Sequence, residues 1–336
     1  MFCACQFPRP ADVPDDGVAP DARENVMITA GPSDGSTAGP LTAFSFTVSQ
    51  GTPYCSFDGA PPTPCSSPIT QSLPAGIHTF TLQAEDSQGV VDRESRTWTV
   101  ACVAAVPGPN TLGLFHFDEP DGTQALHNEV ATTPNSDGFL GNDPIDTMFD
   151  PTRTNNGRYG RALLFQDSSQ TATVVPNRQI SSLGEHTLAL WFLPQYPSPA
   201  YYTLAGTGRS PPASLFAYDL QYIQNVEMNH RVIWTLMTLD QDGVSVYAEN
   251  LTVDVEPGRW HQVVVAYKPG TVATLWVDGV PHSAAQAAMF TGTANPLTLR
   301  VARGLERGPF IVDEVELLDQ AATPDSVLQQ WCPIAP

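Results

Sequence analysis

Three carboxylates near the end of the chain have the residue types and the spacing of an acid–base pair. Asp313, Glu314 and Glu316 lie in a largely apolar run, residues 310–317, that predicts a β-strand. On a strand, Glu314 and Glu316 point to one face about 7 Å apart. Two carboxyl groups at such a spacing can serve retaining or inverting glycoside hydrolysis. We weigh this catalytic interpretation against a structural role for the same residues.

Aromatic side chains that could stack on sugar rings form the second set of candidates. They lie in or near an irregular stretch, residues 194–225, that is rich in Pro and Ser: Tyr196, Tyr201, Tyr202, Tyr218 and Tyr222. Loops over a rigid sheet commonly carry binding residues. Ordinary packing at the edge of a sandwich would use the same tyrosines, and the sequence does not decide between the two.

A third pattern, Gly-x-Ser-x-Gly at residues 31–35, matches the nucleophile elbow of hydrolases. That elbow requires a strand before the serine and a helix after it. Turn residues flank the pattern on both sides, so we do not expect a nucleophile here.

The charge of the chain limits its partners. With 35 acidic and 15 basic residues the formal net charge is −20. Nucleic acids and anionic lipids would be repelled, which argues against both as partners. No stretch approaches the ~18 apolar residues of a membrane helix. The 32 Pro and 25 Gly residues are typical of short strands joined by many turns.

Six cysteines allow fifteen pairings, which the sequence does not resolve. Two pairs suggest themselves by position. Cys55 and Cys65 flank a short Pro-rich segment, and Cys102 and Cys332 stand at the two ends of one long segment. Neither pair has the spacing of a zinc site. We therefore expect an oxidising compartment, outside the cell or on its outer surface.

The first 25 residues are expected to form a disordered tether that is rich in Pro and Asp. Cys3 or Cys5 followed by such a tether resembles a mature bacterial lipoprotein, which implies a lipid anchor on one of them. Two unmodified thiols on a disordered tail are the alternative.

Residues 26–103 have the pattern of a small β-sandwich. Phe44, Phe46 and Val48 alternate with polar residues, and residues 76–84 alternate over nine positions. The unit resembles a bacterial immunoglobulin-like repeat, and the matching positions are Cys55, Asp58-Gly59, Cys65, Leu73, Gly76, His78, Phe80, Ala84, Asp86 and Trp98. The resemblance implies that Cys55 pairs with Cys65, and we expect His78 to be a packing or rim residue.

A linker, residues 104–108, leads to a second unit, residues 109–336, with about a dozen predicted strands. One short helix, Thr323 to Trp331, is predicted at its end, because Thr323 can cap it and Pro324 suits its first position. This pattern predicts a two-sheet jelly roll, so the fold class of the whole chain is all-β.

The second unit resembles the laminin G-like, concanavalin A-like jelly rolls of bacterial surface proteins. Five ordered motifs carry the resemblance: Leu114 to Gly122, Gly157 to Phe165, Trp260 to Tyr267, Leu275 to Gly279, and Ile311 to Val315. In this pattern Asp313 is structural. The leading acid of the related glucanase pattern is missing, because Ile311 and Val312 occupy the nearest positions, which places hydrolase activity in doubt.

The same resemblance implies a bound calcium ion, since relatives often hold one and hard oxygen ligands suit Ca²⁺. Asp118, Glu119 and Asp313, from the opening and closing motifs, are the predicted ligands.

The sequence therefore predicts a non-enzymatic binding or adhesion module that recognises carbohydrate or a surface protein. A glycoside hydrolase or lyase on a jelly-roll scaffold is the first alternative. A structural surface spacer without a ligand is the second.

Overall fold

The computed structural model of the protein contains two compact units. It describes residues 25–130, 137–141, 143–166, 169–174, 185–195, 200–207, 218–224, 230–239, 245–268, 271, 273–283, 297–300, 309–330 and 332. The first unit is built mainly from Thr42–Gln71 and Gly76–Val100, and the second from Ala101 onward. Cys3 and Cys5 of the predicted lipid anchor lie outside the described residues.

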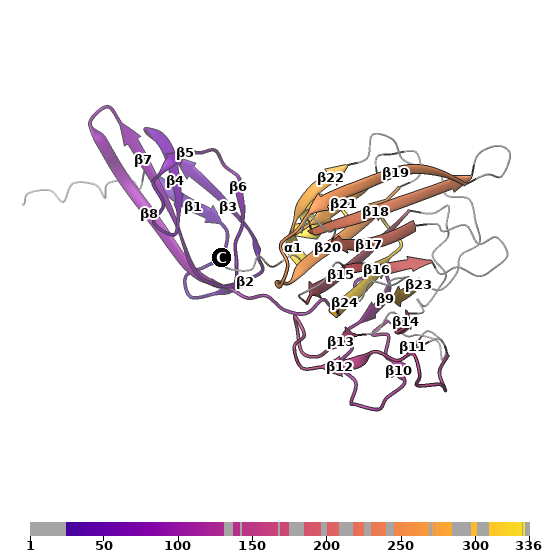
Figure 1. Ribbon diagram of the computed structural model, residues 1–336. Helices are drawn as coiled ribbons and strands as arrows, with labels where there is room; N and C mark the ends of the chain where they lie inside the picture. Colours follow the sequence, from indigo (N-terminus) through magenta and orange to yellow (C-terminus); the bar gives the residue numbers. More distant parts are fainter. Residues whose placement is uncertain are drawn as a thin grey trace, which may run out of the picture. The chain divides into compact units, whose positions relative to one another are not determined.

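The first unit consists of two sheets (Figure 1). One sheet has the order β1 (Val26–Ala30), β3 (Leu41–Val48) and β6 (Ile69–Ser72). The other has the order β2 (Thr37–Ala38), β8 (Gly89–Val100), β7 (Gly76–Asp86), β4 (Thr52–Phe57) and β5 (Thr63–Pro64).

A cluster of aromatic rings joins these two sheets. Phe44 of β3 stacks on Phe80 of β7 with ring centroids 4.2 Å apart, and it meets the edge of Trp98 of β8 at 5.1 Å. All three side chains are buried. Because the rings come from opposite sheets, the first unit is a sandwich held by its apolar faces. The resemblance of this unit to an immunoglobulin-like repeat stays a prediction.

The second unit also contains two sheets, each of eight strands. The first has the order β10 (Ala125–Leu126), β11 (Gly138–Leu140), β14 (Thr171–Val174), β23 (Leu297–Arg300), β16 (Ala200–Thr207), β17 (Tyr218–Gln224), β18 (His230–Leu239) and β19 (Ser245–Asp254). The second has the order β12 (Thr152–Thr154), β13 (Ala162–Phe165), β24 (Phe310–Leu318), β15 (His186–Pro194), β20 (His261–Tyr267), β21 (Thr274–Val277) and β22 (Val280–Ser283), and β9 (Thr111–Phe115) also pairs with β24.

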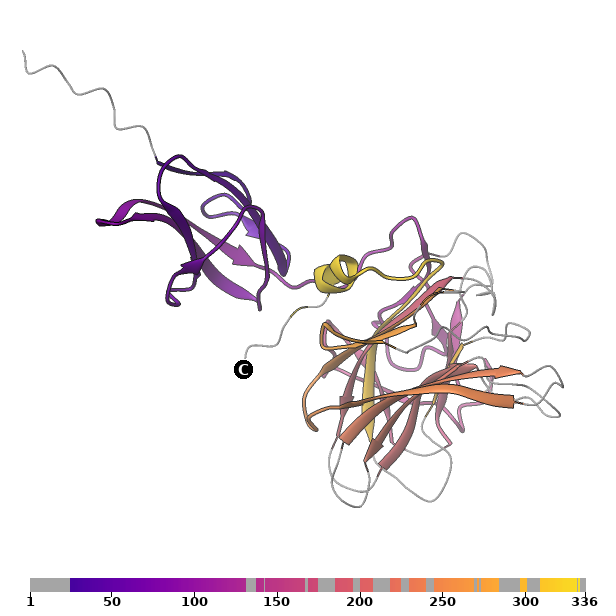
Figure 2. The same cartoon turned by 90° about the horizontal axis from the view of Figure 1, so that it is seen from above.

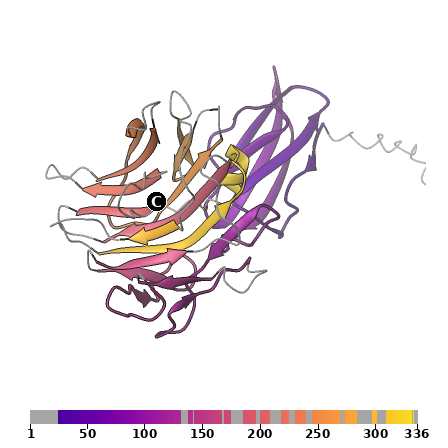
Figure 3. The same cartoon turned by 90° about the vertical axis from the view of Figure 1, so that its right-hand side faces the viewer.

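Non-local pairing organises this second sheet, which we call the β24 sheet. The last strand of the chain, β24, lies between strands from distant parts of the sequence (Figure 3). One large apolar core fills the space between the two sheets, with residues such as Phe192, Trp234 and Val312. The all-β sandwich fold predicted from alternation is thus confirmed.

The central strands of the β24 sheet are buried on both faces. Every residue of β15 and β20 is buried, including those that point away from the core between the sheets. We call this second side the outer face. Ala189, Val264 and Trp276 form an apolar patch on it with Val327 of the helix. Other segments of the chain therefore cover the outer face, and the helix is one of these covers.

The helix is α1 (Pro324–Gln330), close to the predicted boundaries (Figure 2). Thr323 caps it, since the backbone N–H of Ser326 donates to Thr323 Oγ1 at 3.2 Å. Asp325 in the first turn suits the helix dipole. Within the described residues, no helix has the length and apolar character needed to cross a membrane.

Both predicted disulfides are present, Cys55–Cys65 in the first unit and Cys102–Cys332 in the second. Cys102–Cys332 closes a loop with a sequence separation of 230 residues. It joins the segment that enters the second unit to the segment that follows α1.

We predict that replacing Cys102 and Cys332 together by Ser lowers the free energy of unfolding of the second unit by about 5 kcal/mol in the chain-entropy model. A long closed loop restricts the unfolded chain more than a short one does. Urea unfolding followed by tryptophan fluorescence measures this effect, because five of the six tryptophans lie after residue 101.

The matched control is the Cys55→Ser, Cys65→Ser pair, with a sequence separation of 10. It is expected to leave this transition unchanged and to destabilise only the first unit, by roughly 3 kcal/mol. An equal loss in the second unit from both pairs would contradict the assignment of the long disulfide to that unit.

Candidate functional site

The three candidate acids lie where β24 changes its partner along one edge. Pairing with β13 ends at Val312, and pairing with β9 begins at Val315. On the opposite edge, the register with β15 shifts between Ala189 and Trp191. Glu314 has a positive φ of 53°, which is uncommon for a residue with a side chain. This bulge keeps Val312 and Val315 in the core between the sheets.

Asp313 is fully buried at this junction. Its carboxylate accepts hydrogen bonds from the backbone N–H groups of Tyr159 at 3.0 Å and of Glu314 at 2.9 Å. Burial raises the pKa of Asp313 to about 8, although the N–H groups favour the charged form. Asp313 thereby attaches the 157–160 turn to β24.

Both carboxylate oxygens of Glu314 are used by its own chain. Oε1 accepts a hydrogen bond from His116 Nδ1 at 2.7 Å, and Oε2 accepts one from the Ala105 N–H at 3.0 Å. The bond to Glu314 raises the pKa of His116, against the opposing effect of burial. Glu314 therefore attaches β9 and the segment 102–106, which we call the covering segment, to β24.

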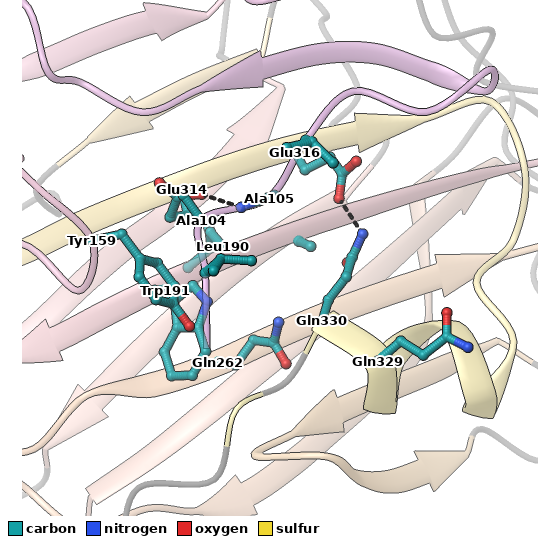
Figure 4. Close-up of a pocket in the computed structure, with 13 residues that line it drawn as sticks. Ala104, Ala105, Tyr159, Leu190, Trp191, Gln262, Glu314, Glu316, Gln329 and Gln330 are labelled. Atoms are coloured by element: carbon teal, nitrogen blue, oxygen red, sulfur yellow. Dashed lines mark hydrogen bonds between the residues drawn. The ribbon is translucent and has the colours of Figure 1, made fainter. Parts of the chain in front are cut away.

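Glu316 holds α1 in the same manner (Figure 4). One oxygen accepts a hydrogen bond from Thr111 Oγ1 at 3.2 Å, and the other accepts one from Gln330 Nε2 at 2.9 Å. The residue is only 3% exposed. Burial is the main cause that raises the pKa of Glu316.

A cavity of about 260 Å³ lies on the outer face beside these acids. Figure 4 shows Tyr159, Trp191 and Glu314 on one side of it, Glu316 and Gln330 on the other, and the Gln262 amide between them. Its lining residues are Val103, Ala104, Ala105, Val106, Tyr159, Ala189, Leu190, Trp191, Gln262, Glu314, Glu316, Gln329 and Gln330. The structure thus places both acids of the catalytic interpretation on the wall of one cavity.

Beside this cavity, Gln262 Oε1 is buried and has no hydrogen-bond partner among the described residues. Burial raises the pKa of the Tyr159 hydroxyl, and a hydrogen bond with Arg158 opposes that rise. The Tyr159 ring meets Trp191 edge-on, with centroids 6.4 Å apart. Trp191 and Gln262 lie directly opposite each other on β15 and β20. Sequence analysis missed these residues, because Tyr159 appeared only as part of a family motif and the other two as ordinary strand residues.

The predicted calcium ligands have separate partners. The Asp118 carboxylate accepts the Arg161 N–H at 2.6 Å, and Glu119 forms an ion pair with Arg153 at 3.0 Å. Asp313 binds backbone N–H groups, as described above. Among the residues that the structure describes, no three His, Cys, Asp or Glu side chains gather into a metal-binding group. Calcium binding therefore remains a prediction.

The predicted sugar-stacking tyrosines fall largely outside the described side chains. Tyr201 and Tyr202 belong to β16 and Tyr218 to β17, but only their backbone is described, and Tyr196 lies outside the described residues. Tyr222, directly opposite Tyr202, is 2% exposed and belongs to the core between the sheets. For Tyr222 the structure therefore favours the packing alternative, because its ring faces inward.

Two of the histidine–aspartate pairs stabilise turns. His261 Nδ1 donates to Asp278 at 2.7 Å, while Asp278 also accepts the Gln262 N–H at 3.0 Å. His78 Nδ1 donates to Asp58 at 2.7 Å in the first unit. Asp278 and Asp58 both have a positive φ near 50°. His261 is fully buried in mid-sheet.

One family model matches a large part of the second unit. Residues 167–328 match the model of the concanavalin A-like lectin/glucanases superfamily, Laminin_G_3. The predicted resemblance is confirmed over this range. No curated protein matches the chain.

Solved structures of binding domains are similar to the chain at low identity. The binding domain of botulinum neurotoxin serotype D has 10% identity and a TM-score of 0.48, over 65% of this chain and 50% of that one. Domain 4 of AbnA, an extracellular arabinanase from Geobacillus stearothermophilus solved with arabinotriose, has 14% identity and a TM-score of 0.46, over 66% and 98%. This chain thus spans half the length of the neurotoxin chain it matches.

We predict that Glu316→Gln stabilises the protein relative to wild type increasingly as the pH rises above about 4.5. Because burial raises the pKa of Glu316, the folded protein holds this proton more tightly than the unfolded chain does above the ordinary pKa of 4.5. In the wild type, Glu316 therefore lowers the free energy of unfolding as the pH rises from 4.5 through the folded pKa. The difference grows by at most about 1.4 kcal/mol per pH unit. Urea unfolding at pH 5 and pH 8 measures it.

Glu256→Gln is the matched control, because the Glu256 side chain is 74% exposed. It should show a constant difference from wild type at both pH values. A Glu316→Gln difference that does not change with pH would contradict the assignment.

Proposed function

We propose that this protein is a non-catalytic binding module that recognises carbohydrate on the outside of the cell. The observation that carries the proposal is the use of all four carboxylate oxygens of Glu314 and Glu316 by the protein itself. The name of the matched superfamily covers both lectins and glucanases, and the hydrogen bonding of these acids favours binding over hydrolysis.

A glycoside hydrolase needs one carboxyl group that protonates the leaving oxygen and a second that attacks or activates water. Each must reach the sugar. Glu314 and Glu316 are 4% and 3% exposed, and their hydrogen bonds hold β9, the covering segment and α1. Breaking those bonds to perform chemistry would release three elements of the fold, which supports a structural role for the acids.

An extracellular location agrees with the two disulfides, which persist in oxidising compartments. A lipid anchor at Cys3 or Cys5 would hold the module at the outer surface, with the acidic tether as a spacer. A net charge of −20 supports neutral glycans or surface proteins as partners rather than nucleic acids.

We predict saturable binding of the full chain to a subset of glycans on an array, with calcium present. Glu314→Gln and Glu316→Gln variants that keep the wild-type circular dichroism should bind the same glycans. The wild type should release no reducing sugar from them, which a colorimetric end-group assay measures. Parallel arrays with a chelator test whether calcium contributes.

Reducing-sugar release that either Gln variant abolishes would establish the hydrolase instead. A blank array with folded protein would refute carbohydrate recognition and favour a protein partner or a spacer role.

A further inference from the structure

We propose that Asn156 is a site of spontaneous deamidation, and that its isoaspartate product loosens the outer face of the second unit. The site lies in the loop of residues 155–161, which joins the antiparallel strands β12 and β13. Gly157 follows Asn156 directly. The inference concerns a reaction of the chain with itself, so it does not depend on which ligand the module recognises.

The reaction is intramolecular and needs only water as a co-reactant. The Gly157 main-chain nitrogen loses its proton and attacks Asn156 Cγ, so that a C–N bond forms. The bond from Cγ to Nδ2 breaks, and Nδ2 takes up that proton and leaves as ammonia. Water then opens the cyclic imide at either carbonyl, which gives aspartate or isoaspartate at this position. A nucleophile held in the same chain acts at a high effective concentration.

The structure leaves both reacting groups free. Asn156 is exposed, so water reaches its side chain. Within the described part of the chain, its side-chain amide has no hydrogen-bond partner, and the Gly157 N–H donates to none. Gly157 also has no side chain that could shield its nitrogen. Neither group therefore has to break an existing hydrogen bond before the attack.

The fold requires glycine at position 157. A Cβ atom there would lie 2.7 Å from the carbonyl oxygens of both Gly160 and Arg161. Such a distance is far below van der Waals contact, and a close-packed loop cannot absorb it cheaply. A larger residue would slow the attack but does not fit the turn, so the packing of the loop preserves the reactive pair.

Two other asparagines of the second unit lack these features. Asn110 Nδ2 donates a hydrogen bond at 2.8 Å, and the N–H of Thr111 after it donates another at 3.2 Å. Thr111 is also β-branched, which crowds its nitrogen. Asn128 is fully buried, and its Oδ1 accepts two backbone N–H groups at 3.1 Å each. Both asparagines serve as internal controls.

The turn that follows the reactive bond is attached to the outer face at three points. The Tyr159 N–H donates to Asp313 at 3.0 Å. The Arg158 guanidinium lies over the Trp191 ring, 4.7 Å from its centroid, and donates to the Cys332 carbonyl at 3.1 Å. These contacts join the turn to β24, to β15 and to the segment after α1.

Isoaspartate adds one carbon atom to the main chain directly before this turn. The turn is closely packed at Gly157, so the added length has to displace the contacts of Arg158 and Tyr159. Aspartate at position 156 adds a negative charge on an exposed side chain and keeps the length of the main chain. The two products therefore separate the effect of main-chain length from that of charge.

Peptide mapping of the full chain, aged at pH 8 and at pH 5, tests the site by tandem mass spectrometry, which distinguishes Asn156 from Asn155. Deamidation at Asn156 should be at least about tenfold faster than at Asn110 or Asn128. It should be faster at pH 8, because the attacking nitrogen has to lose its proton. Labelling by protein isoaspartyl methyltransferase should detect isoaspartate at Asn156. A rate no higher than that of the two controls would overturn the site.

Thermal melting tests the effect on the outer face. Chains that carry isoaspartate should melt about 2 to 4 °C below fresh wild type, the shift expected from the loss of one ordinary hydrogen bond in a domain of this size. Asn156→Asp is the matched control, because it has the charge without the added carbon, and it should melt like fresh wild type. Asn156→Ser, aged in the same way, should keep its melting temperature.

Repair of the aged protein separates this modification from other damage. Repeated treatment with the methyltransferase and S-adenosylmethionine converts isoaspartate to aspartate and should restore the melting temperature. Aged wild type that contains isoaspartate but melts like Asn156→Asp would keep the site and overturn the effect on the outer face. An equal loss in aged Asn156→Ser would attribute the change to damage elsewhere and overturn the same effect.

Discussion

The outer face of the second unit depends on one constraint, which is that β24 pairs with two different strands along the same edge. Pairing with β13 ends at Val312 and pairing with β9 begins at Val315, so two residues between them have no partner strand on this edge. At these two residues, side chains supply the hydrogen bonds to neighbouring segments. Asp313 and Glu314 occupy that gap, and their carboxylates bind the 157–160 turn, β9 and the covering segment. Buried backbone groups at such a junction need partners, and carboxylates can accept several hydrogen bonds at once.

The cavity is a consequence of the same junction. Glu314 holds the covering segment and Glu316 holds α1, so both covers are attached to β24 at the sheet's outer face. Neither cover fills the space above Trp191 and Gln262 completely. The two acids that resemble a catalytic pair in the sequence therefore hold the covers of the outer face in place.

The sequence predicted local features well and the site poorly. Strands, the helix at Thr323 and the two disulfides follow from alternation, capping and cysteine positions, which short windows of sequence contain. Tyr159, Trp191 and Gln262 come from three separate segments, and only strand pairing brings them together. The turn at Glu314 has no local signal either, because glutamate seldom adopts a positive φ. The nearly continuous apolar runs at residues 188–193 and 263–267 are the sequence signal of strands buried on both faces.

The disulfide between Cys102 and Cys332 also determines how the second unit bears mechanical load. It links the point where the chain enters this unit to the point just after its last helix. Tension applied to the chain on either side of the unit would pass from one cysteine to the other through a covalent bond. The two sheets, which lie between these cysteines in sequence, would then stay unstretched.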